Sequence, residues 1–311
     1  MNTLLAKEYQ YLLESSDEER MAFIFQYRWI NYPRAKLMLD KLEELFKYGK
    51  NFPRITSLLI VGEGNNGKSS IISRFAELHP PYDYNIERPA NLPNDYFDTH
   101  TGAGIPVVHV DAPNEPSESR LYSQILSELS VPYKETETVA RKQYLVQYYL
   151  KLLEVEMLVI DEIHNILSGS IARQKQVLNA IKSLSNALQI PIVLSGTKAA
   201  LSAINTDPQI ESRFMPMYLP KWQFDDEFGS LLATYASRLP LKNESKLTDE
   251  AVADEILDLS GGYIGNMFDL LRQAAKIAIE TKSERITLVE IRACNYVSPH
   301  QRSKNAMLEQ L

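Results

Sequence analysis

Residues 62–69 read Gly62-Glu63-Gly64-Asn65-Asn66-Gly67-Lys68-Ser69, and this stretch fits the pattern G-x-x-x-x-G-K-[ST]. The run before it, Leu58–Val61, is apolar throughout and predicts a short buried strand. After it, Ile71, Ile72 and Phe75 recur at helical spacing and predict an amphipathic helix over residues 69–78. A strand, a glycine-rich loop and a helix in this order predict a phosphate-binding loop in an α/β protein.

The chemistry of such a loop follows from its backbone. The glycines let the chain curl so that consecutive N–H groups point at phosphate oxygens, and the helix N-terminus adds the positive end of its dipole. Lys68 is expected to reach the β- and γ-phosphates, and the Ser69 hydroxyl is expected to hold Mg²⁺. We therefore predict ATP and Mg²⁺ as ligands. The predicted nucleotide-binding residues are those of the loop and the next helical turn: Gly62, Glu63, Gly64, Asn65, Asn66, Gly67, Lys68, Ser69 and Ser70.

A second motif is the apolar run Met157–Ile160, which ends in the two carboxylates Asp161 and Glu162. A strand of this kind can place Asp161 next to the phosphate-binding loop, where it orders Mg²⁺ through water. Glu162 is then positioned to polarise the attacking water. One more strand candidate, Val107–Val110, lies between the two motifs. Together with the extra glutamate, this arrangement favours an ATPase with a carboxylate base over a small GTPase.

Two later segments add candidate catalytic residues. The strand candidate Pro191–Leu194 is followed by Ser195 and Thr197, whose hydroxyls lie where a γ-phosphate sensor would sit, although a simple strand-ending turn explains them equally well. Arg213 comes just before the fifth strand candidate, Met217–Leu219. In ATPases that form rings or filaments, an arginine at this place reaches the neighbouring subunit's site and neutralises transition-state charge. We predict that in-trans role for Arg213.

The string from Asp161 to His164 also spells the helicase box DExH. A helicase needs a second RecA-like domain, and the residues after the predicted α/β core are too few and too helical to form one. A zinc site is disfavoured because no second histidine follows His164 at helical spacing. His164 is expected to be a polar contact beside the site, or to have no special role.

The composition bounds the class of protein. The chain has 311 residues, 44% of them hydrophobic and 23% charged, which is ordinary for a soluble globular protein. A single cysteine, Cys294, excludes disulfides within the chain and favours a reducing, cytoplasmic location. The apolar runs are strand-sized and the first residues carry no signal-peptide pattern, so no membrane association is expected. The net charge of −7 argues against a protein that coats nucleic acid with its whole surface, but it allows a narrow basic stripe.

The pattern along the chain predicts four segments. Residues 1–50 are expected to form an N-terminal helical extension, and residues 51–220 alternate strands with helices, which predicts a mostly parallel sheet covered on both faces. Within this core, the polar loop over residues 80–104 is read as a functional insertion or a loose surface loop. Residues 221–294 carry only helical patterns and predict a small helical lid domain, and residues 295–311 are read as a polar tail.

Taken together, these features resemble an AAA+ ATPase, and more narrowly the chain resembles the TniB family of transposition proteins and the related TnsC proteins. The resemblance covers roughly residues 20 to 293. It rests on six stretches: LLIVGEGNNGKSSIISRF (58–75), PSESRLYSQIL (116–126), VEMLVIDEIHNILSG (155–169), LNAIKSLSNALQIPIVLSGT (178–197), AINTDPQIESRF (203–214) and LPKW (219–222).

This resemblance implies a fold and a function. The fold would be a P-loop AAA+ core with a five-stranded parallel sheet, a helical lid and an N-terminal helical extension. The function would be that of a bacterial ATP-dependent regulator of DNA transposition, which assembles on double-stranded DNA as a homo-oligomeric ring or helical filament. It would link a target-selection protein of the TniQ type to a DDE transposase. The resemblance also points to two segments as lining a DNA channel, with the candidate contacts Ser117, Ser119, Arg120, Lys134, Thr136 and Thr138.

The chain departs from the AAA+ pattern at one position. A second sensor arginine is common early in a lid helix, but Asn266 stands there in this sequence, and Arg272 lies further along the same helix. This leaves open the role of the lid in nucleotide sensing. It also motivates an alternative of another class, an ATP-gated DNA-binding scaffold with little turnover, against which the intact Asp161-Glu162 pair argues.

Overall fold

A computed structural model describes residues 2, 4–51, 55–85, 101–205 and 208–297. The chain forms two compact units. The first, called here the α/β unit, consists of residues 37–64 and 68–219. The second, called the helical unit, combines residues 1–36 and 220–311 with three residues of the predicted phosphate-binding loop, Asn65–Gly67.

The α/β unit is built on a parallel sheet of five strands in the order β4-β5-β6-β1-β7, which confirms the predicted fold class. Every residue of β1, β5 and β6 is buried, as expected for strands covered on both faces. The strand at the edge begins three residues before the predicted Met217, at Phe214. The bounds are β1 Ser57–Val61, β4 Val107–Asp111, β5 Met157–Asp161, β6 Ile192–Gly196 and β7 Phe214–Tyr218.

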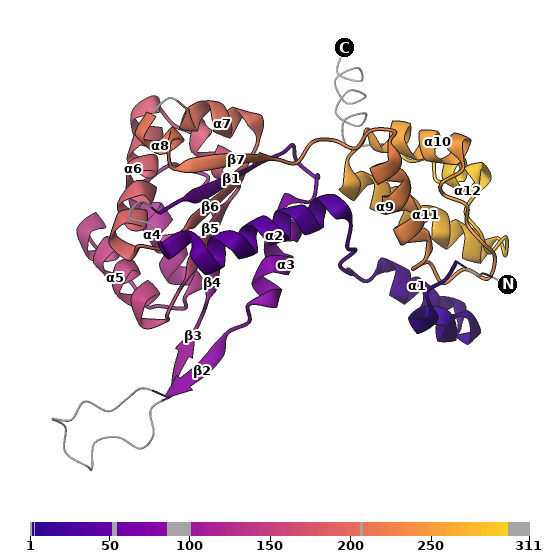
Figure 1. Ribbon diagram of the computed structural model, residues 1–311, viewed down its shortest axis with the longest axis horizontal. Coiled ribbons are helices and arrows are strands. Elements are labelled where there is room, and N and C mark those ends of the chain that lie inside the picture. The colour runs from indigo at the N-terminus through magenta and orange to yellow at the C-terminus, as the bar shows by residue number, and fades with distance from the viewer. Residues whose placement is uncertain (1, 3, 52–54, 86–100, 206–207, 298–311) are drawn as a thin grey trace. The chain divides into compact units, whose positions relative to one another are not determined.

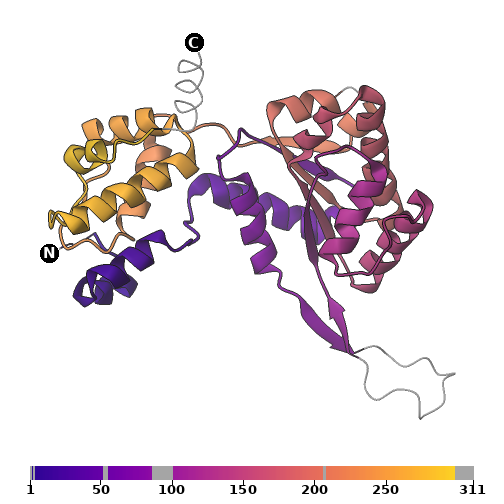
Figure 2. The same ribbon diagram turned by 180° about the vertical axis from the view of Figure 1, so that it is seen from behind.

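Helices cover both faces of this sheet. Figures 1 and 2 show α4, α5 and α6 over one face and α2 and α3 over the other. Of α2 (Pro33–Tyr48), only residues 37–48 belong to this unit. The other helices of the unit are η2 Gly49–Asn51, α3 Lys68–Leu78, α4 Glu118–Glu128, α5 Val139–Leu152, η3 Ile163–Ser168, α6 Ile171–Leu188, α7 Lys198–Ile204 and α8 Pro208–Glu211.

Successive side chains along each strand point to opposite faces of the sheet, so the core of the α/β unit has two parts. On the face that carries α4 to α7, the strands contribute Leu59, Val110 and Ile160 to one continuous apolar cluster with the helices. The residues between them face α2 and α3, where Phe46 of α2 and Phe75 of α3 pack edge to face with ring centroids 5.9 Å apart. This second face also carries polar side chains at the carboxyl ends of the strands, which positions the site described below.

The polar segment over residues 80–104 contains structure that its composition did not predict. β2 (Tyr82–Asn85) and β3 (Thr101–Gly104) pair antiparallel in a two-stranded hairpin that projects from the α/β unit in Figures 1 and 2. The interpretation of this segment as a loose surface loop is therefore wrong at residues 82–85 and 101–104. A hairpin of four-residue strands has too short an apolar pattern to be recognised by alternation. Residues 86–100 lie outside the described part of the chain.

The helical unit is formed by helices from both ends of the chain. Its longest helix, α11, buries one continuous apolar face that includes Met267, Leu271 and Ala275. α10 ends at Gly261, whose φ of +64° is the left-handed conformation that glycine adopts freely. The helices are η1 Lys7–Glu14, α1 Asp17–Phe25, the first turn of α2, α9 Asp226–Ala236, α10 Glu250–Ser260, α11 Ile264–Glu280 and α12 Leu288–Ala293. The predicted polar tail lies outside the described residues beyond residue 297.

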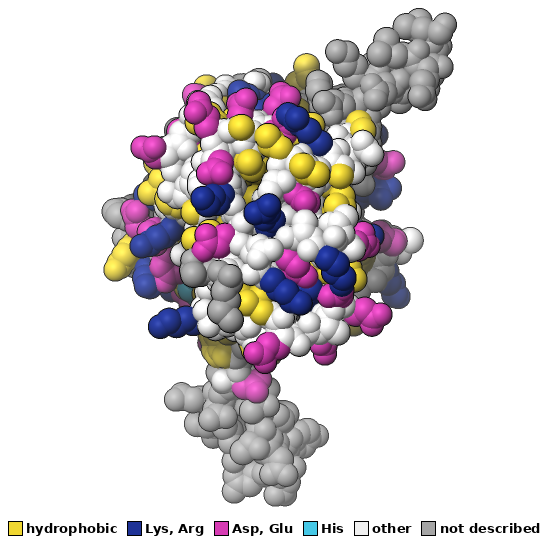
Figure 3. Space-filling model, turned by 90° about the vertical axis from the view of Figure 1, so that its right-hand side faces the viewer, with side chains coloured by type: hydrophobic (Ala, Val, Ile, Leu, Met, Phe, Trp, Pro, Cys, Tyr) yellow, Lys and Arg dark blue, Asp and Glu magenta, His cyan; other side chains and the backbone are white. Residues whose placement is uncertain are grey.

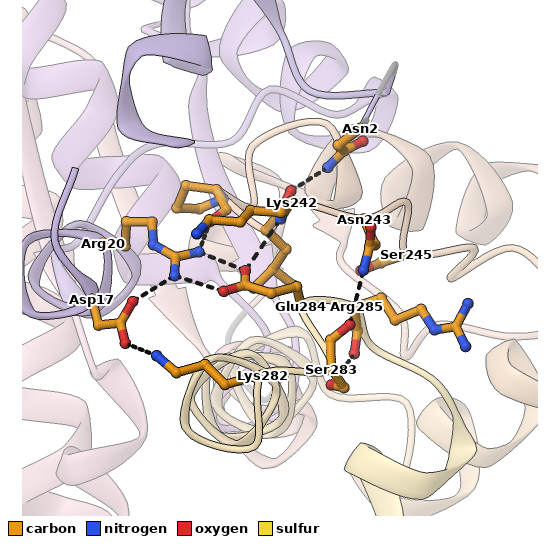
Figure 4. Close-up of polar contacts among 12 residues, drawn as sticks. Asn2, Asp17, Arg20, Lys242, Asn243, Ser245, Lys282, Ser283, Glu284 and Arg285 are labelled. Carbon is orange, nitrogen blue, oxygen red and sulfur yellow. Dashed lines mark hydrogen bonds and ion pairs between the residues drawn. The ribbon is translucent and has the colours of Figure 1, made fainter. Parts of the chain in front are cut away.

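A buried ion pair joins the N-terminal helix α1 to the C-terminal helices of the same unit (Figure 4). Arg20 is fully buried and donates to both carboxylate oxygens of Glu284, at 2.6 and 2.8 Å. The same guanidinium donates to Asp17 at 2.7 Å and to the Pro240 carbonyl oxygen at 3.1 Å. Burial alone would raise the pKa of Glu284, but the hydrogen bonds from Arg20 hold it below its usual value.

The surface of the helical unit carries charges of both signs. In the face shown in Figure 3, lysine and arginine side chains alternate with aspartate and glutamate, and no large field of one sign forms on that face. No described helix is long and apolar enough to span a bilayer.

Candidate nucleotide site

The phosphate-binding loop leaves the end of β1 in a tight curl. The Gly62 N–H donates to the Gly196 carbonyl oxygen at 3.0 Å, and a Cβ on Gly62 would lie only 2.9 Å from the Leu219 carbonyl oxygen, so only glycine fits there. Asn65 and Gly67 adopt positive φ values of 59° and 87°. Left-handed residues of this kind occur in loops whose successive backbone N–H groups form an anion-binding concavity.

Lys68 is the first residue of α3 and is 5% exposed. Its ammonium group donates to the carbonyl oxygen of Glu63 at 2.9 Å. The side chain therefore runs back along the loop from the helix that follows it. This places the charge beside the loop backbone, where the prediction requires it.

The register of the sheet explains why Asp161 lies beside the loop. Asp111, at the end of β4, pairs with Asp161, at the end of β5. Ile160 pairs with Leu194 of β6, so Ser195 follows at the same level as Asp161. One row on the face covered by α3 therefore contains the last residues of β4 and β5 and the last but one of β6. α3 begins at this edge and brings Ser69 to the row.

Asp161 is 1% exposed and accepts two close hydrogen bonds. The Ser69 hydroxyl donates to Oδ2 at 2.5 Å, and the Glu162 N–H donates to Oδ1 at 2.7 Å. His109 Nε2 lies 3.8 Å from Oδ2. Burial raises the pKa of Asp161, but the polar groups of His109, Ser195, Ser69 and the Glu162 backbone outweigh it and hold the pKa well below its usual range. Asp161 is therefore a carboxylate at neutral pH.

The donor set at this edge fits Mg²⁺. Ser69 and Asp161 offer oxygen atoms within hydrogen-bond distance of each other, and oxygen atoms are the ligands that Mg²⁺ prefers. His109, Asp111 and Asp161 also lie within 4.8 Å of one another through their ligand atoms. His109 and Asp111 were missed by the sequence analysis. Their signal was available, because alternate residues at the end of a strand beside β5 must share its face.

Glu162 has a backbone conformation that is unusual for a residue other than glycine. Its φ and ψ of 52° and 34° are left-handed, and the helical turn η3 starts directly after it. Strain of this kind is often found at functional positions. Its carboxylate oxygen Oε2 lies 3.0 Å from His164 Nδ1. His164 therefore lies beside the carboxylate of the candidate base.

The two candidate sensor hydroxyls lie in different surroundings. Ser195 is fully buried in β6 and belongs to the row with Asp161. Thr197 is partly exposed and occupies the residue before α7, without a side-chain cap to that helix. The sheet register puts Ser195 at the level of Asp161, whereas Thr197 follows the end of β6.

Arg213 lies at the other end of the strands. The N–H of Ser57, the first residue of β1, donates to the Arg213 carbonyl oxygen at 3.0 Å, whereas the phosphate-binding loop follows Val61 at the end of the same strand. A five-residue strand separates these points by roughly 15 Å. The Arg213 guanidinium donates to Asn186 Oδ1 of α6 at 2.8 Å. The arginine is held at the edge opposite its own loop.

Within the helical unit, Asn266 contacts the phosphate-binding loop. Asn65 Nδ2 donates to Asn266 Oδ1 at 2.5 Å, and Asn266 Nδ2 donates to the Ser260 carbonyl oxygen at 2.9 Å. The Gly265 N–H donates to the Asn65 carbonyl oxygen at 3.1 Å. Arg272 instead pairs with Asp269 on the same helix. Of the two candidates for the second sensor position, the structure brings Asn266 to a loop residue.

The candidate DNA contacts lie around the start of α4 and in the connection from α4 to α5. Ser117 occupies the N-cap position of α4, and Ser119 follows in the first turn. Arg120 is exposed and pairs with Glu115 at 2.8 Å. Thr138 caps α5 by accepting from the Arg141 N–H. Lys134 and Thr136 are exposed in the connection, with glutamates at 135 and 137. These positions form no concentrated positive patch.

Solved structures with a similar fold are P-loop AAA+ ATPases. The Aeropyrum pernix ORC2 protein, in its ADPNP–ADP complexes, has a TM-score of 0.59 at 14% identity over 87% of this chain and 70% of that one. The A. pernix ORC1 protein in complex with DNA has a TM-score of 0.58 at 16% identity over 89% and 68%. A variant of Thermotoga maritima RuvB has a TM-score of 0.50 at 15% identity over 88% and 72%. The likeness confirms the predicted AAA+ fold.

The sequence itself gives a narrower assignment. No curated protein matches the chain. The family model described as "Bacterial TniB protein" matches residues 20–224, which is well over half of the 311 residues. This range contains the phosphate-binding loop, the Asp161-Glu162 pair and Arg213, and it confirms the predicted resemblance. The chain belongs to the TniB family.

Proposed function

We propose that this chain is a bacterial, cytoplasmic ATPase that regulates DNA transposition. It assembles on double-stranded target DNA, hydrolyses ATP, and links a target-selection protein of the TniQ type to a DDE transposase. Membership of the TniB family supports the biological setting. The observation that carries the enzymatic part is the 2.5 Å hydrogen bond between Ser69 and Asp161, because it unites the phosphate-binding loop with the acidic strand.

In this proposal the residues at the strand ends have separate roles in ATP binding and hydrolysis. Lys68 and the loop N–H groups bind the triphosphate, and Ser69 and Asp161 hold Mg²⁺, Asp161 through water. Bound Mg²⁺ supplies neutralising charge at the β- and γ-phosphates. Glu162, oriented by His164, takes the proton of the attacking water. Ser195 and Thr197, at the end of β6 and directly after it, are the candidate γ-phosphate sensors.

The position of Arg213 supports an assembly in which each site is shared by two subunits. An arginine side chain extends about 7 Å, roughly half the distance along β1 that separates Arg213 from its own loop. It can therefore complete only the site of another copy. A ring or a helical filament satisfies this condition at every subunit except those at an open end.

The structure bears differently on the two alternatives, a helicase and a scaffold with little turnover. A helicase of the DExH class requires a second RecA-like sheet, and the described residues outside the α/β unit form helices only. A scaffold with little turnover is favoured by Asn266 at the second sensor position, because asparagine brings no positive charge to the phosphates. The Asp161–Glu162 geometry favours turnover. The rate of ATP hydrolysis decides between the scaffold and the active ATPase.

The test combines phosphate release with electron microscopy of purified protein on plasmid DNA. With ATP and Mg²⁺ we expect ordered assemblies on the DNA and DNA-dependent hydrolysis. Glu162→Gln should still bind ATP and assemble, while hydrolysis falls by at least a hundredfold, since a general base typically contributes about 10²–10⁴-fold. Hydrolysis that survives in Glu162→Gln overturns the catalytic assignment. Strand separation supports the helicase, and assembly with negligible turnover supports the scaffold.

A further inference from the structure

A shallow depression on α6 lies beside Arg213, at the end of the strands away from the phosphate-binding loop. Its volume is about 450 Å³. The lining residues recur at intervals of three and four and therefore form one stripe of the helix: Asn179, Lys182, Ser183, Asn186 and Ala187. Amide, ammonium and hydroxyl groups can all donate hydrogen bonds, and the stripe contains no carboxylate.

Asn186 connects this stripe to Arg213. Its Oδ1 accepts from the Arg213 guanidinium at 2.8 Å. Arg213 itself is half-buried, which limits the directions in which its side chain can lie. The contact joins α6 to the start of β7, two elements far apart in the sequence. Asn186 thus fixes where the guanidinium stands on this face.

Lys182 brings a second positive charge to the same stripe. It lies one helical turn before Asn186, so their Cβ atoms are about 6 Å apart. Its ammonium group contacts Oε1 of Gln209, a neutral amide oxygen from α8. The residues that line the depression with Lys182 include no carboxylate. Ser183 is held from the other side by the amide of Gln143 at 3.2 Å.

Lys182 lies on the stripe, and Arg213 is hydrogen-bonded to it through Asn186. Two cations beside a stripe without a carboxylate fit an anion with several oxygen atoms. Phosphate is such an anion, and lysine and arginine are the side chains that bind it. Two sources of phosphate exist in the proposed assembly, which are the ATP of a second copy and the DNA backbone. The hydrogen bond that Arg213 donates to Asn186 favours the first, because it ties the stripe to the arginine for which the in-trans role is proposed.

We propose that the α6 stripe and Arg213 together form the surface that receives the triphosphate of a second copy of this chain. In this arrangement Lys182 is a second in-trans cation, and Asn186 is the positioning residue of Arg213. This inference rests on the proposed in-trans role of Arg213. It adds two residues to the shared site that the sequence analysis did not identify.

The test is complementation between subunits. A Glu162→Gln subunit has a dead site but an intact α6 surface, whereas a Lys182→Ala subunit has an intact site and a defective surface. Each should be weakly active alone, with Lys182→Ala about ten- to a hundredfold below wild type, as for the loss of one charge-assisted hydrogen bond. Mixed in equal amounts, they should regain a substantial fraction of wild-type hydrolysis, because Glu162→Gln subunits then complete the sites of Lys182→Ala subunits.

Three controls complete the design. Arg213→Ala mixed with Glu162→Gln tests the in-trans proposal itself. Lys182→Arg should retain most of the activity, and Asn186→Ala should lower kcat and also be complemented by Glu162→Gln. Lys175→Ala, on the same helix but outside the depression, should behave as wild type. ATP binding by each single variant, followed with a fluorescent analogue, shows that its own site is intact.

The outcomes separate the two proposals. If neither Arg213→Ala nor Lys182→Ala is complemented, the in-trans site is wrong and this inference fails with it. If Arg213→Ala is complemented but Lys182→Ala is not, only the role of Lys182 is overturned, and its defect lies within its own subunit. If Lys182→Ala weakens DNA binding without ATP and leaves DNA-free hydrolysis unchanged, the stripe binds the DNA backbone instead.

Discussion

At the scale of single residues, the candidate site depends on a few side chains whose neighbours lie far away in the sequence. The carboxylate of Asp161 lies beside His109 of β4 and Ser69 of α3, and the sheet register puts Ser195 of β6 at the same level. The chemistry of Asp161 was predictable from its motif. Its strongly lowered pKa was not, because it arises from groups that only the sheet register brings together.

His164 offers a test of how Glu162 is oriented. Replacing His164 with Ala removes the 3.0 Å contact to the carboxylate and should lower kcat about tenfold, a part of what a positioned base contributes, with little change in KM. Steady-state ATP hydrolysis measures both constants. His164→Asn keeps a polar group and should be less affected. An equal loss in binding and turnover would show that His164 acts on the nucleotide itself.

Gly265 tests the contact between the loop and the start of α11. A Cβ at this position would lie 1.9 Å from Asn65 Oδ1, so Gly265→Ala must displace the Asn65 side chain and break its bond to Asn266. We expect weaker ATP binding by about three- to tenfold, the equivalent of one hydrogen bond. The matched control is Gly229→Ala in α9, where a Cβ meets nothing within 4 Å. It should stabilise the fold slightly and leave ATP affinity unchanged, and a decrease there would undermine the comparison.

At the scale of elements, the pair α4 and α5 is held together by a buried lysine that the sequence analysis missed. Lys142 of α5 is 1% exposed, and its ammonium group donates to Ser123 of α4 at 2.8 Å and to the Glu135 carbonyl oxygen at 3.3 Å. It also lies over the ring of Tyr133. Lys142 therefore fixes the connection that carries the candidate DNA contacts Lys134 and Thr136.

Lys142→Ala should loosen this connection. The lost hydrogen bonds and the cavity left by the side chain together predict a decrease of about 2–4 kcal/mol in the free energy of unfolding. Urea denaturation measures it, and hydrogen exchange should rise over residues 130–138. Lys151→Ala, on the same helix, provides the comparison, because Lys151 is exposed. If exchange in the connection is unchanged in Lys142→Ala, the lysine does not hold that segment.

At the scale of the whole molecule, residues from the two ends of the chain form one unit. The junction is the buried pair of Arg20 and Glu284, which lies between α1 and the turn after α11 (Figure 4). Removing one partner leaves a buried charge without its counterion. Arg20→Ala should therefore lower the free energy of unfolding by about 3–5 kcal/mol. The double variant Arg20→Met with Glu284→Leu should recover most of this loss, and calorimetry distinguishes the two.

The same junction predicts a pH dependence. The folded-state pKa of Glu284 is lowered, and the ion pairs with Lys282 and Arg20 lower the pKa of Asp17 to about 2. Because these pKa values are depressed on folding, their stabilisation is present above the unfolded values near 4 and is lost as the pH falls through the folded values. The melting temperature should drop between about pH 5 and pH 2, and Glu284→Gln should have a shallower drop. If the melting temperature falls equally with pH in the wild type and in Glu284→Gln, this prediction is wrong.

The local pattern of the sequence by itself determined the parallel α/β core, the phosphate-binding loop and the carboxylate pair. Each of these is a short motif whose flanking elements follow from apolar spacing within about fifteen residues. Local patterns could not reveal the hairpin of β2 and β3, because its two strands are short and separated in sequence. The same limit explains why the start of β7 was placed three residues late.

The tertiary structure decided the rest, because it depends on distances between elements that no local pattern contains. Sheet register placed His109 and Asp111 beside Asp161. Arg213 lies at the opposite end of the strands from the phosphate-binding loop of its own chain. Packing of α6 against the start of β7 set Asn186 against that arginine. The 62–69 loop predicted a nucleotide, and only the fold showed that Arg213 stands at the opposite edge of the sheet from this loop.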